Sequence, residues 1–451
     1  MYMGTVFAGI PEYVDCADRG DTLVGVCRNL AVCVNPTTTI REAVDKHLDG
    51  SNIVEGEQIA GISVLAESFV NGRCNVIAHG DILDSEGPVR NAGYTGEYIT
   101  STMLHSRLPA AMMTRSDDIE FSDFVNWVLL SLIHAEELNI TKDTADTLPI
   151  TGSSTFGEEY ESMFIDAIKA VGNDGEMYQA HWGEVNPRKR INEINNGDTG
   201  LLFSFPFGHT KIPLDMSDNQ VPRTVPNSTL ETIATRGRLR CGIVVDHGQS
   251  PGFADYDTDT DKWHGLDVEF CRGLGAALFA ADGMIEFIQY DTIEDAFIGL
   301  AANESDVFAG APFNLQNDVT ERTTGNGYDF SPIYFYGDDT TGVGGDDKVV
   351  NGGYNRALAT RESDIQWSRF VRWVTFATIY AEEENITSAS DVHLMPVVDY
   401  FGESYKQAFR DLILGVGNYG EMYERSIESY IPRSGRNKLN TGNSPQHHSY
   451  F

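Results

Sequence analysis

Four aspartates with an alternating spacing come nearest to a chemical motif in this chain: Asp255, Asp257, Asp259 and Asp261. Alternating carboxylates open the ligand set of a calcium-binding loop, because Ca²⁺ prefers several oxygen ligands. Such a loop also needs a glycine in its middle and a glutamate at its twelfth position, where this chain has Leu266 or Val268. We therefore expect a solvated acidic loop here and no metal site.

Patterns that would indicate catalysis or a cofactor are weak. The stretch 415–420 has the glycine spacing of a dinucleotide-binding loop, but it follows a predicted helix instead of a strand, so we interpret it as a helix stop. We find no Ser-His-Asp arrangement, phosphate-binding loop or metal-binding pair of histidines, and we interpret His447 and His448 as part of a terminal tail. The sequence thus predicts a protein that is not an enzyme and has no cofactor.

The charge of the chain narrows its partners. The 451 residues include 67 acidic against 32 basic side chains, a formal charge of −35. A strongly anionic surface makes nucleic acid and anionic membranes poor partners. The longest apolar run, 124–135, is shorter than the roughly 18 to 20 residues that span a bilayer, so we expect no membrane insertion. Because the first ten residues lack the pattern of a secretion signal, export has to be inferred from other features.

Six cysteines, an even number, lie in close sequence neighbourhoods. We predict three disulfides: Cys16 with Cys27, Cys33 with Cys74, and Cys241 with Cys271. Three disulfides would indicate an oxidising compartment, and the alternative is six buried thiols. No CxxC or Cys/His spacing suggests zinc.

A long internal repeat organises the chain. Segment 114–128 matches 360–374, and Arg361 lies 246 residues after Arg115. The match continues from 135–141 to 381–387, and 171–178 matches 416–423. The period is far longer than that of a solenoid, so we interpret it as the duplication of a domain-sized module.

The periodicity of apolar residues predicts the elements of each module. Residues 121–132 and 160–171 each carry one apolar stripe at three- and four-residue steps, which is typical of amphipathic helices. Elsewhere short apolar strands alternate with helices, which indicates an α/β fold with parallel sheets. We expect strands at 31–34, 239–245, 285–290 and 306–309, and helices at 39–48, 266–279 and 293–301.

Several segments together resemble the periplasmic (type II) amino-acid-binding proteins of ABC transporters, of the general L-amino-acid-binding type. Those similar to the first lobe of that family are 228–243, 251–253, 265–272, 309–310, 321–322 and 330–334. Segments 32–39 and 71–74 are similar to the second lobe, and the repeated helices to the part that returns from the second lobe to the first. The resemblance implies two α/β lobes that close on a ligand by a hinge movement, without bond breaking.

The resemblance also implies a site for a small L-amino acid, built from Thr37, Thr38, Thr39, Asp81, Phe253 and Arg322. The threonines precede a predicted helix, whose backbone N–H groups and dipole favour a carboxylate. Arg322 would hold that carboxylate by two hydrogen bonds, and Phe253 would cover the ligand side chain. Asp81 would pair with the ammonium group of the ligand, although it matches the family position only when the two sequences are shifted by one residue.

Some departures from the family pattern suggest that this site is eroded. The family has a glycine before the threonines and a glutamate after them, whereas this chain has Pro36 and Ile40. Proline removes one backbone donor. The first-lobe loop, which offers a threonine in the family, here reads Ala-Pro-Phe-Asn at 311–314.

Compared with the family, the two modules are incomplete. Copy one has a hinge and second-lobe-like domain (1–110) and a helical return segment (111–208), but little of a first lobe. After a linker (209–227), copy two has a first-lobe-like domain (228–336), a Gly/Asp-rich linker (337–353) and a return segment (354–451), with no second lobe. We therefore predict α/β lobes of the periplasmic-binding-protein type II in two tandem, incomplete copies.

The missing first lobe of copy one leaves the stripe with Phe124, Trp127 and Val128 without a partner in its own module. Burial of such side chains contributes about 1.5 to 3 kcal/mol each, so we expect the stripe to be covered. Either both return segments share the single first lobe, or copy one docks on another chain. In the second case a head-to-tail contact that does not close into a ring builds a filament, with other copies of the chain as partners. Two function classes stay open: a self-associating structural subunit with an eroded cleft, which we favour at this stage, and a receptor for L-amino acids in uptake or sensing.

Sequons for N-glycosylation occur at Asn139, Asn227, Asn303 and Asn385. Asn139 and Asn385 occupy equivalent places in the repeat, so shared ancestry explains that coincidence. Chance matches are common in a chain this long, so the location is inferred from the cysteines: the predicted disulfides favour a secreted protein in an extracellular or periplasmic location.

Overall fold

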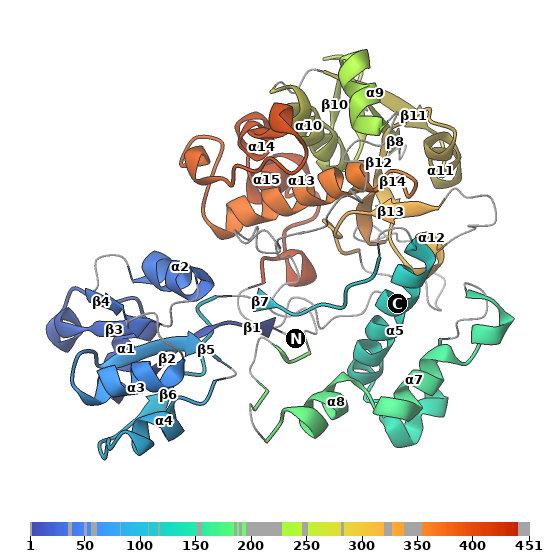
Figure 1. Cartoon of the computed structure of the whole chain (residues 1–451). Helices are drawn as coiled ribbons and strands as arrows, with labels where there is room; N and C mark the ends of the chain where they lie inside the picture. Colours follow the sequence, from blue (N-terminus) through green and yellow to red (C-terminus); the bar gives the residue numbers. More distant parts are fainter. Residues whose placement is uncertain are drawn as a thin grey trace, which may run out of the picture. The chain divides into compact units, whose positions relative to one another are not determined.

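The computed structural model describes residues 2–34, 38–48, 52–55, 61–81, 83–106, 108–115, 118–150, 156–184, 187–188, 192–194, 228–245, 251–280, 284–319, 327–337 and 354–440. These residues form two compact units (Figure 1). The first unit comprises the described residues within 1–113 and 175–193, and the second those within 114–174, residue 194 and those within 228–440. The division into six segments expected from the sequence stays a prediction.

The first unit is built on a five-stranded sheet with the order β4-β3-β5-β2-β6. Its strands are β2 (Thr5–Gly9), β3 (Ala31–Val34), β4 (Asn52–Glu55), β5 (Val76–Gly80) and β6 (Ile99–Thr100), and β1 (Tyr2–Met3) pairs separately with β7 (Leu108–Pro109). β3 runs parallel to β4 and β5, whereas β2 runs antiparallel to β5 and β6. The sheet is therefore mixed, and not wholly parallel as expected.

Helices α1 (Pro11–Asp18), α2 (Thr38–His47), α3 (Ile62–Val70) and α4 (Glu86–Asn91) accompany this sheet. The strands alternate between two hydrophobic clusters, as side chains in a strand must. Val32 and Val34 belong to the cluster that includes Val14 of α1 and Val44 of α2. Cys33, between them, belongs to the cluster with Leu65 of α3. Both faces of the sheet are thus covered, as in an α/β sandwich.

The second unit has a sheet with the order β11-β8-β12-β14-β13. The strands are β8 (Leu239–Val244), β11 (Ile285–Tyr290), β12 (Val307–Pro312), β13 (Tyr328–Phe330) and β14 (Arg356–Arg361); a separate hairpin joins β9 (Asp255–Asp257) and β10 (Lys262–His264). The helices of its α/β part are α9 (Thr229–Arg236), α10 (Leu266–Phe279), α11 (Ile293–Ala301) and α12 (Leu315–Val319). β8, β11 and β12 are parallel, but β14 is antiparallel to both neighbours, so this sheet is mixed too.

The return segments contain matching helices. In copy one these are α5 (Ile119–Glu137), α7 (Met163–Val171) and α8 (Asp174–His181), and in copy two α13 (Ile365–Glu383), α14 (Ala408–Val416) and α15 (Tyr419–Ser426). Asp118 caps the start of α5 and Asp364 that of α13, each by accepting a hydrogen bond from a backbone N–H three residues on. The repeat in the sequence is therefore a repeat of local structure.

Copy two packs its return helices on the first-lobe-like domain. Leu412 and Val416 of α14 are buried in one cluster with Leu274 of α10. A Cβ atom at Gly415 would come 2.6 Å from the Cβ of Ala276 on α10, so glycine allows the two helices to approach closely. The equivalent residue in copy one is an alanine, Ala170.

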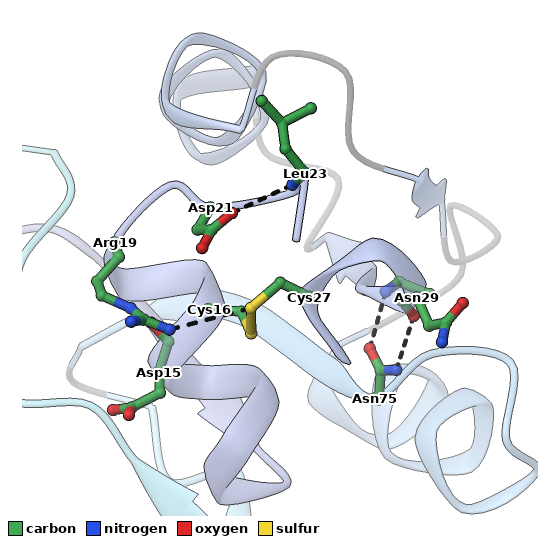
Figure 2. The surroundings of a disulfide bond; sticks show 9 residues. Asp15, Cys16, Arg19, Asp21, Leu23, Cys27, Asn29 and Asn75 are labelled. Carbon is green, nitrogen blue, oxygen red and sulfur yellow. Dashed lines mark hydrogen bonds between the residues drawn. A yellow bond between two sulfur atoms is a disulfide. The ribbon is translucent and has the colours of Figure 1, made fainter. Parts of the chain in front are cut away.

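Three disulfides staple the units, and they are the three pairs predicted from the sequence. Cys16 is bonded to Cys27 and Cys33 to Cys74 in the first unit, and Cys241 to Cys271 in the second. Figure 2 shows the first of these beside Arg19, which lies 3.9 Å from the Cys27 sulfur and donates to the Asp15 carbonyl. No described cysteine is free, so the alternative of buried thiols is wrong.

Candidate functional site

Two predicted ligand-binding elements lie at one edge of the sheet in the first unit. β3 ends at Val34 and α2 begins at Thr38, while the neighbouring parallel strand β5 ends at Gly80 and is followed by Asp81. The carboxyl ends of parallel strands meet at the same sheet edge, so the start of α2 and Asp81 are brought together there. Thr38 and Thr39 are described only as the first backbone turn of α2, and Thr37 lies outside the described residues.

Asp81 is held firmly at this edge. Its side chain is 8% exposed, and its Oδ1 accepts a hydrogen bond of 3.1 Å from the backbone N–H of Gly4. Its own backbone N–H donates to the Gly4 carbonyl at 2.9 Å. The first turn of a helix attracts a carboxylate, and a buried carboxylate attracts an ammonium group. The edge therefore combines the two complementary charges that an amino-acid zwitterion needs.

The predicted residues of the second unit are placed differently. Arg322 lies outside the described residues. Phe253 is only 1% exposed, with its ring 4.8 Å from that of Phe335 and the guanidinium carbon of Arg356 3.7 Å from its centroid. A ligand would reach this ring only if Arg356 moved. The role of Phe253 as cover for a ligand side chain stays a prediction.

A buried polar network surrounds Phe253, and sequence reasoning missed it. Arg356 donates to Asp267 at 2.8 Å, and the Tyr334 hydroxyl donates to the other Asp267 oxygen at 2.6 Å. The backbone N–H of Gly310 donates in turn to the Tyr334 hydroxyl at 2.8 Å. Burial raises the pKa of Asp267, although Arg356 and Tyr334 act in the opposite direction. The one signal in the sequence was an aspartate, Asp267, in the first turn of a helix with many apolar residues.

The apolar stripe of copy one has partners inside the second unit. Trp127 of α5 is fully buried, its ring stacks on Phe313 with 6.1 Å between centroids, and its indole N–H donates to Asp318 of α12 at 2.7 Å. Phe124 packs edge to face on Phe156 and Tyr160. Trp127 is thus covered by residues of segment 228–336 in copy two, which is the first of the two arrangements expected from the sequence. Phe124 packs within its own return segment.

The four alternating aspartates form a hairpin turn. Asp257 accepts hydrogen bonds from the backbone N–H groups of Asp259 and Thr260 and from the Thr260 hydroxyl, and these bonds lower the pKa of Asp257. Asp255 accepts from the backbone N–H of Gly252 at 2.6 Å. Among the described residues, no group of three or more His, Cys, Asp or Glu side chains could hold a metal ion.

Three of the four sequons lie in described parts of the chain. Asn139, Asn303 and Asn385 are exposed and have positive φ angles of 55°, 61° and 56°. Asn227 lies outside the described residues. Exposure satisfies a steric requirement for modification, and glycosylation itself stays a prediction. A search of the described helices finds none with the length and apolarity needed to cross a bilayer.

Two mixed five-stranded sheets with flanking helices define an α/β protein, as the sequence predicted. The chain is similar in sequence to periplasmic amino-acid-binding proteins of ABC transporters. One relative, named as an amino-acid ABC transporter-binding protein, YhdW of Escherichia coli, is 22% identical over 313 residues, which cover 47% of this chain and 89% of the relative.

Two further comparisons agree in coverage. The general L-amino acid-binding periplasmic protein AapJ of Rhizobium johnstonii is 23% identical over 306 residues, covering 46% of this chain and 86% of AapJ. A periplasmic binding protein from Brucella ovis, solved with glutathione bound, is 21% identical with a TM-score of 0.37 and covers 47% of this chain and 95% of its own. No protein-family profile matches the chain. The curated relatives are named as binding proteins.

Proposed function

We propose that this protein is a non-enzymatic solute-binding receptor for a small L-amino acid or a closely related ligand. The observation that carries the proposal is the sheet edge of the first unit, where α2 begins beside the buried Asp81. A ligand carboxylate would face the first turn of α2, and its ammonium group would face Asp81. The relatedness to amino-acid-binding proteins supports the same conclusion.

This proposal reverses the order of preference reached from the sequence. The structural role rested on the missing lobes, the departures at the ligand site and an apolar stripe that another chain would cover. Trp127 of that stripe is fully buried on Phe313 and Asp318 of the same chain. The receptor needs no such stripe, and the curated relatives are named for amino-acid binding. The three disulfides favour an oxidising, extracellular or periplasmic location for the protein.

Titration calorimetry with pools of L-amino acids tests the proposal. We expect saturable heat from at least one pool, and an affinity at least tenfold weaker in Asp81→Asn, because a charged hydrogen bond contributes about 1.5 to 3 kcal/mol. Asp84→Asn is the matched control, since Asp84 is exposed three residues away, and it should bind as the natural protein does. Absence of heat with every pool, or equal affinities in Asp81→Asn and Asp84→Asn, would refute the assignment.

Self-association is the second candidate function, favoured by two exposed residues of copy one. Phe121 is 53% exposed where the equivalent Trp367 of copy two is fully buried, and Val171 is 48% exposed where Val416 is 3% exposed. An apolar face of this kind would suit a further lobe of the type formed by residues 228–336, supplied head to tail by another copy. Light scattering at micromolar concentration checks it: a monomer would remove this candidate, and growing polymers would support it.

A further inference from the structure

Arg356 lies in a setting that resembles a binding site for a cation. Its guanidinium carbon is 3.7 Å from the ring centroid of Phe253 and 4.6 Å from that of Tyr354. Two aromatic rings and a carboxylate therefore border one cationic group, since Arg356 also donates to Asp267. We name Phe253, Tyr354 and Asp267 the cation cage. Aromatic faces and a charged acceptor are the groups with which proteins recognise free cationic ligands.

The cation cage is buried, and hydrogen bonds fix two of its side chains. The side chains of Arg356 and Asp267 are 5% and 3% exposed. Asp267 is fixed by the Tyr334 hydroxyl at 2.6 Å, and Tyr354 donates to the Gly310 carbonyl at 3.1 Å. Removal of water strengthens both the ion pair and the contact of the cation with the rings. The cage would thus keep its shape with a different cation inside.

Gly310 leaves room for the cation. A Cβ atom at this position would lie 2.4 Å from the Asp267 carboxylate and 3.0 Å from Arg356 Nη1. Its φ of +85° is also one that residues with side chains rarely adopt. The space in front of Asp267 is therefore kept for the guanidinium group by the absence of a side chain on β12.

The arginine is delivered by a different segment from most of the cage. Phe253, Asp267 and Gly310 belong to the first-lobe-like domain 228–336, whereas Arg356 is the first residue of β14 in the return segment. Arg356 and Asp267 are 89 residues apart in the sequence. β14 pairs with β12 in the sheet (Figure 1), and this pairing places Arg356 beside residues of segment 228–336, to which Arg356 itself does not belong.

We propose that the cation cage is a binding site for a guanidinium group and that Arg356 occupies it as a built-in ligand. The aromatic wall at Phe253 is therefore closed to free ligands in the natural protein. Removal of the Arg356 side chain opens the cage to alkylguanidinium ions, free L-arginine among them. The inference rests on the proposed function in one respect only, the predicted role of Phe253 as cover for a ligand side chain.

Chemical rescue of Arg356→Ala by methylguanidinium tests this inference on the full chain. We expect the variant to unfold at a lower temperature than the natural protein. Methylguanidinium at millimolar concentration should raise its midpoint saturably, by about 3 to 5 °C at ten times the dissociation constant, and leave the natural protein unchanged. Rescue should vanish when Asp267→Asn is added to Arg356→Ala, because the carboxylate partner is then lost.

Arg372→Ala is the matched control. It also removes an arginine of the return segment from a pair with an aspartate, Asp329 at 2.9 Å, but no aromatic cation contact is described for it. If Arg356→Ala does not fold alone, its refolding yield with and without methylguanidinium is the readout. Equal effects of methylguanidinium on both variants, or none on Arg356→Ala, would overturn the inference. The calorimetric test of amino-acid binding uses the natural protein with Asp81→Asn, so its failure is a separate result.

Discussion

The contact between Trp127 and Asp318 decides how the return segment of copy one is held, and Trp127→Phe probes it. Phenylalanine keeps a ring that can stack on Phe313 but lacks the indole N–H that donates to Asp318 at 2.7 Å. Loss of this donor leaves a buried acceptor on Asp318 unsatisfied, which costs about 1 to 3 kcal/mol, and a smaller ring in a fully buried position adds a further loss of roughly 1 kcal/mol. We expect the second unit to lose about 2 to 4 kcal/mol of stability.

Urea unfolding at neutral pH measures this loss, with circular dichroism as the probe. Trp263→Phe is the control, because Trp263 is half-buried between Tyr256 and Phe287 and its loss should cost less than about 1.5 kcal/mol. Asp318→Asn completes a double-mutant cycle with Trp127→Phe. If the two changes are additive, or Trp127→Phe costs no more than Trp263→Phe, the contact does not hold the segment and the covered stripe loses its support.

Three more outcomes follow from buried groups. Burial, and then the charge of a neighbouring aspartate, raise the pKa of Asp318, so the folded state binds its proton more tightly than the unfolded state does. The free energy of unfolding should therefore fall as pH rises above about 4. Asp318→Asn should reduce this fall, as measured by urea unfolding at several pH values. Burial and the nearby His105 lower the pKa of His47, so the first unit should lose stability as pH falls through about 6.5. His47→Gln should reduce this loss, as measured by thermal unfolding at several pH values. An unchanged dependence of stability on pH in the variant would contradict this prediction. Replacement of Cys33 and Cys74 by alanine opens a bond with a sequence separation of 41 residues and should cost about 4 kcal/mol in urea unfolding, whereas a cost near zero would contradict the chain-entropy reasoning.

Elements with a strong local pattern could be predicted from the sequence. The apolar run after Gly265 predicted the helix 266–279, which the structure has as α10 with the same bounds. β3 and β11 also have the predicted bounds. In these segments the apolar period and the flanking turn residues indicate the same element, so local and tertiary preferences agree.

Strand direction and long-range polar contacts could not be predicted in this way. The antiparallel placement of β14 depends on which neighbour it meets in the sheet, and no local period encodes it. Arg356 and Asp267 are 89 residues apart, and Trp127 and Asp318 are 191 apart. Each of these residues alone suggests a solvated charge or a core aromatic. The resemblance to a family supplied Asp81 but gave no sign of the arginine that covers Phe253.

The glycine at the α10 contact has a consequence for exchange between the two repeats. Recombination between such similar segments would place an alanine, as in Ala170 of copy one, at the position of Gly415. The Cβ atom of that alanine would lie 2.6 Å from the Cβ of Ala276. The exchanged helix would therefore have to pack farther from α10. A gene conversion that leaves the helix caps intact would still yield a poorly closed core, and selection against such products would keep the two copies from becoming identical.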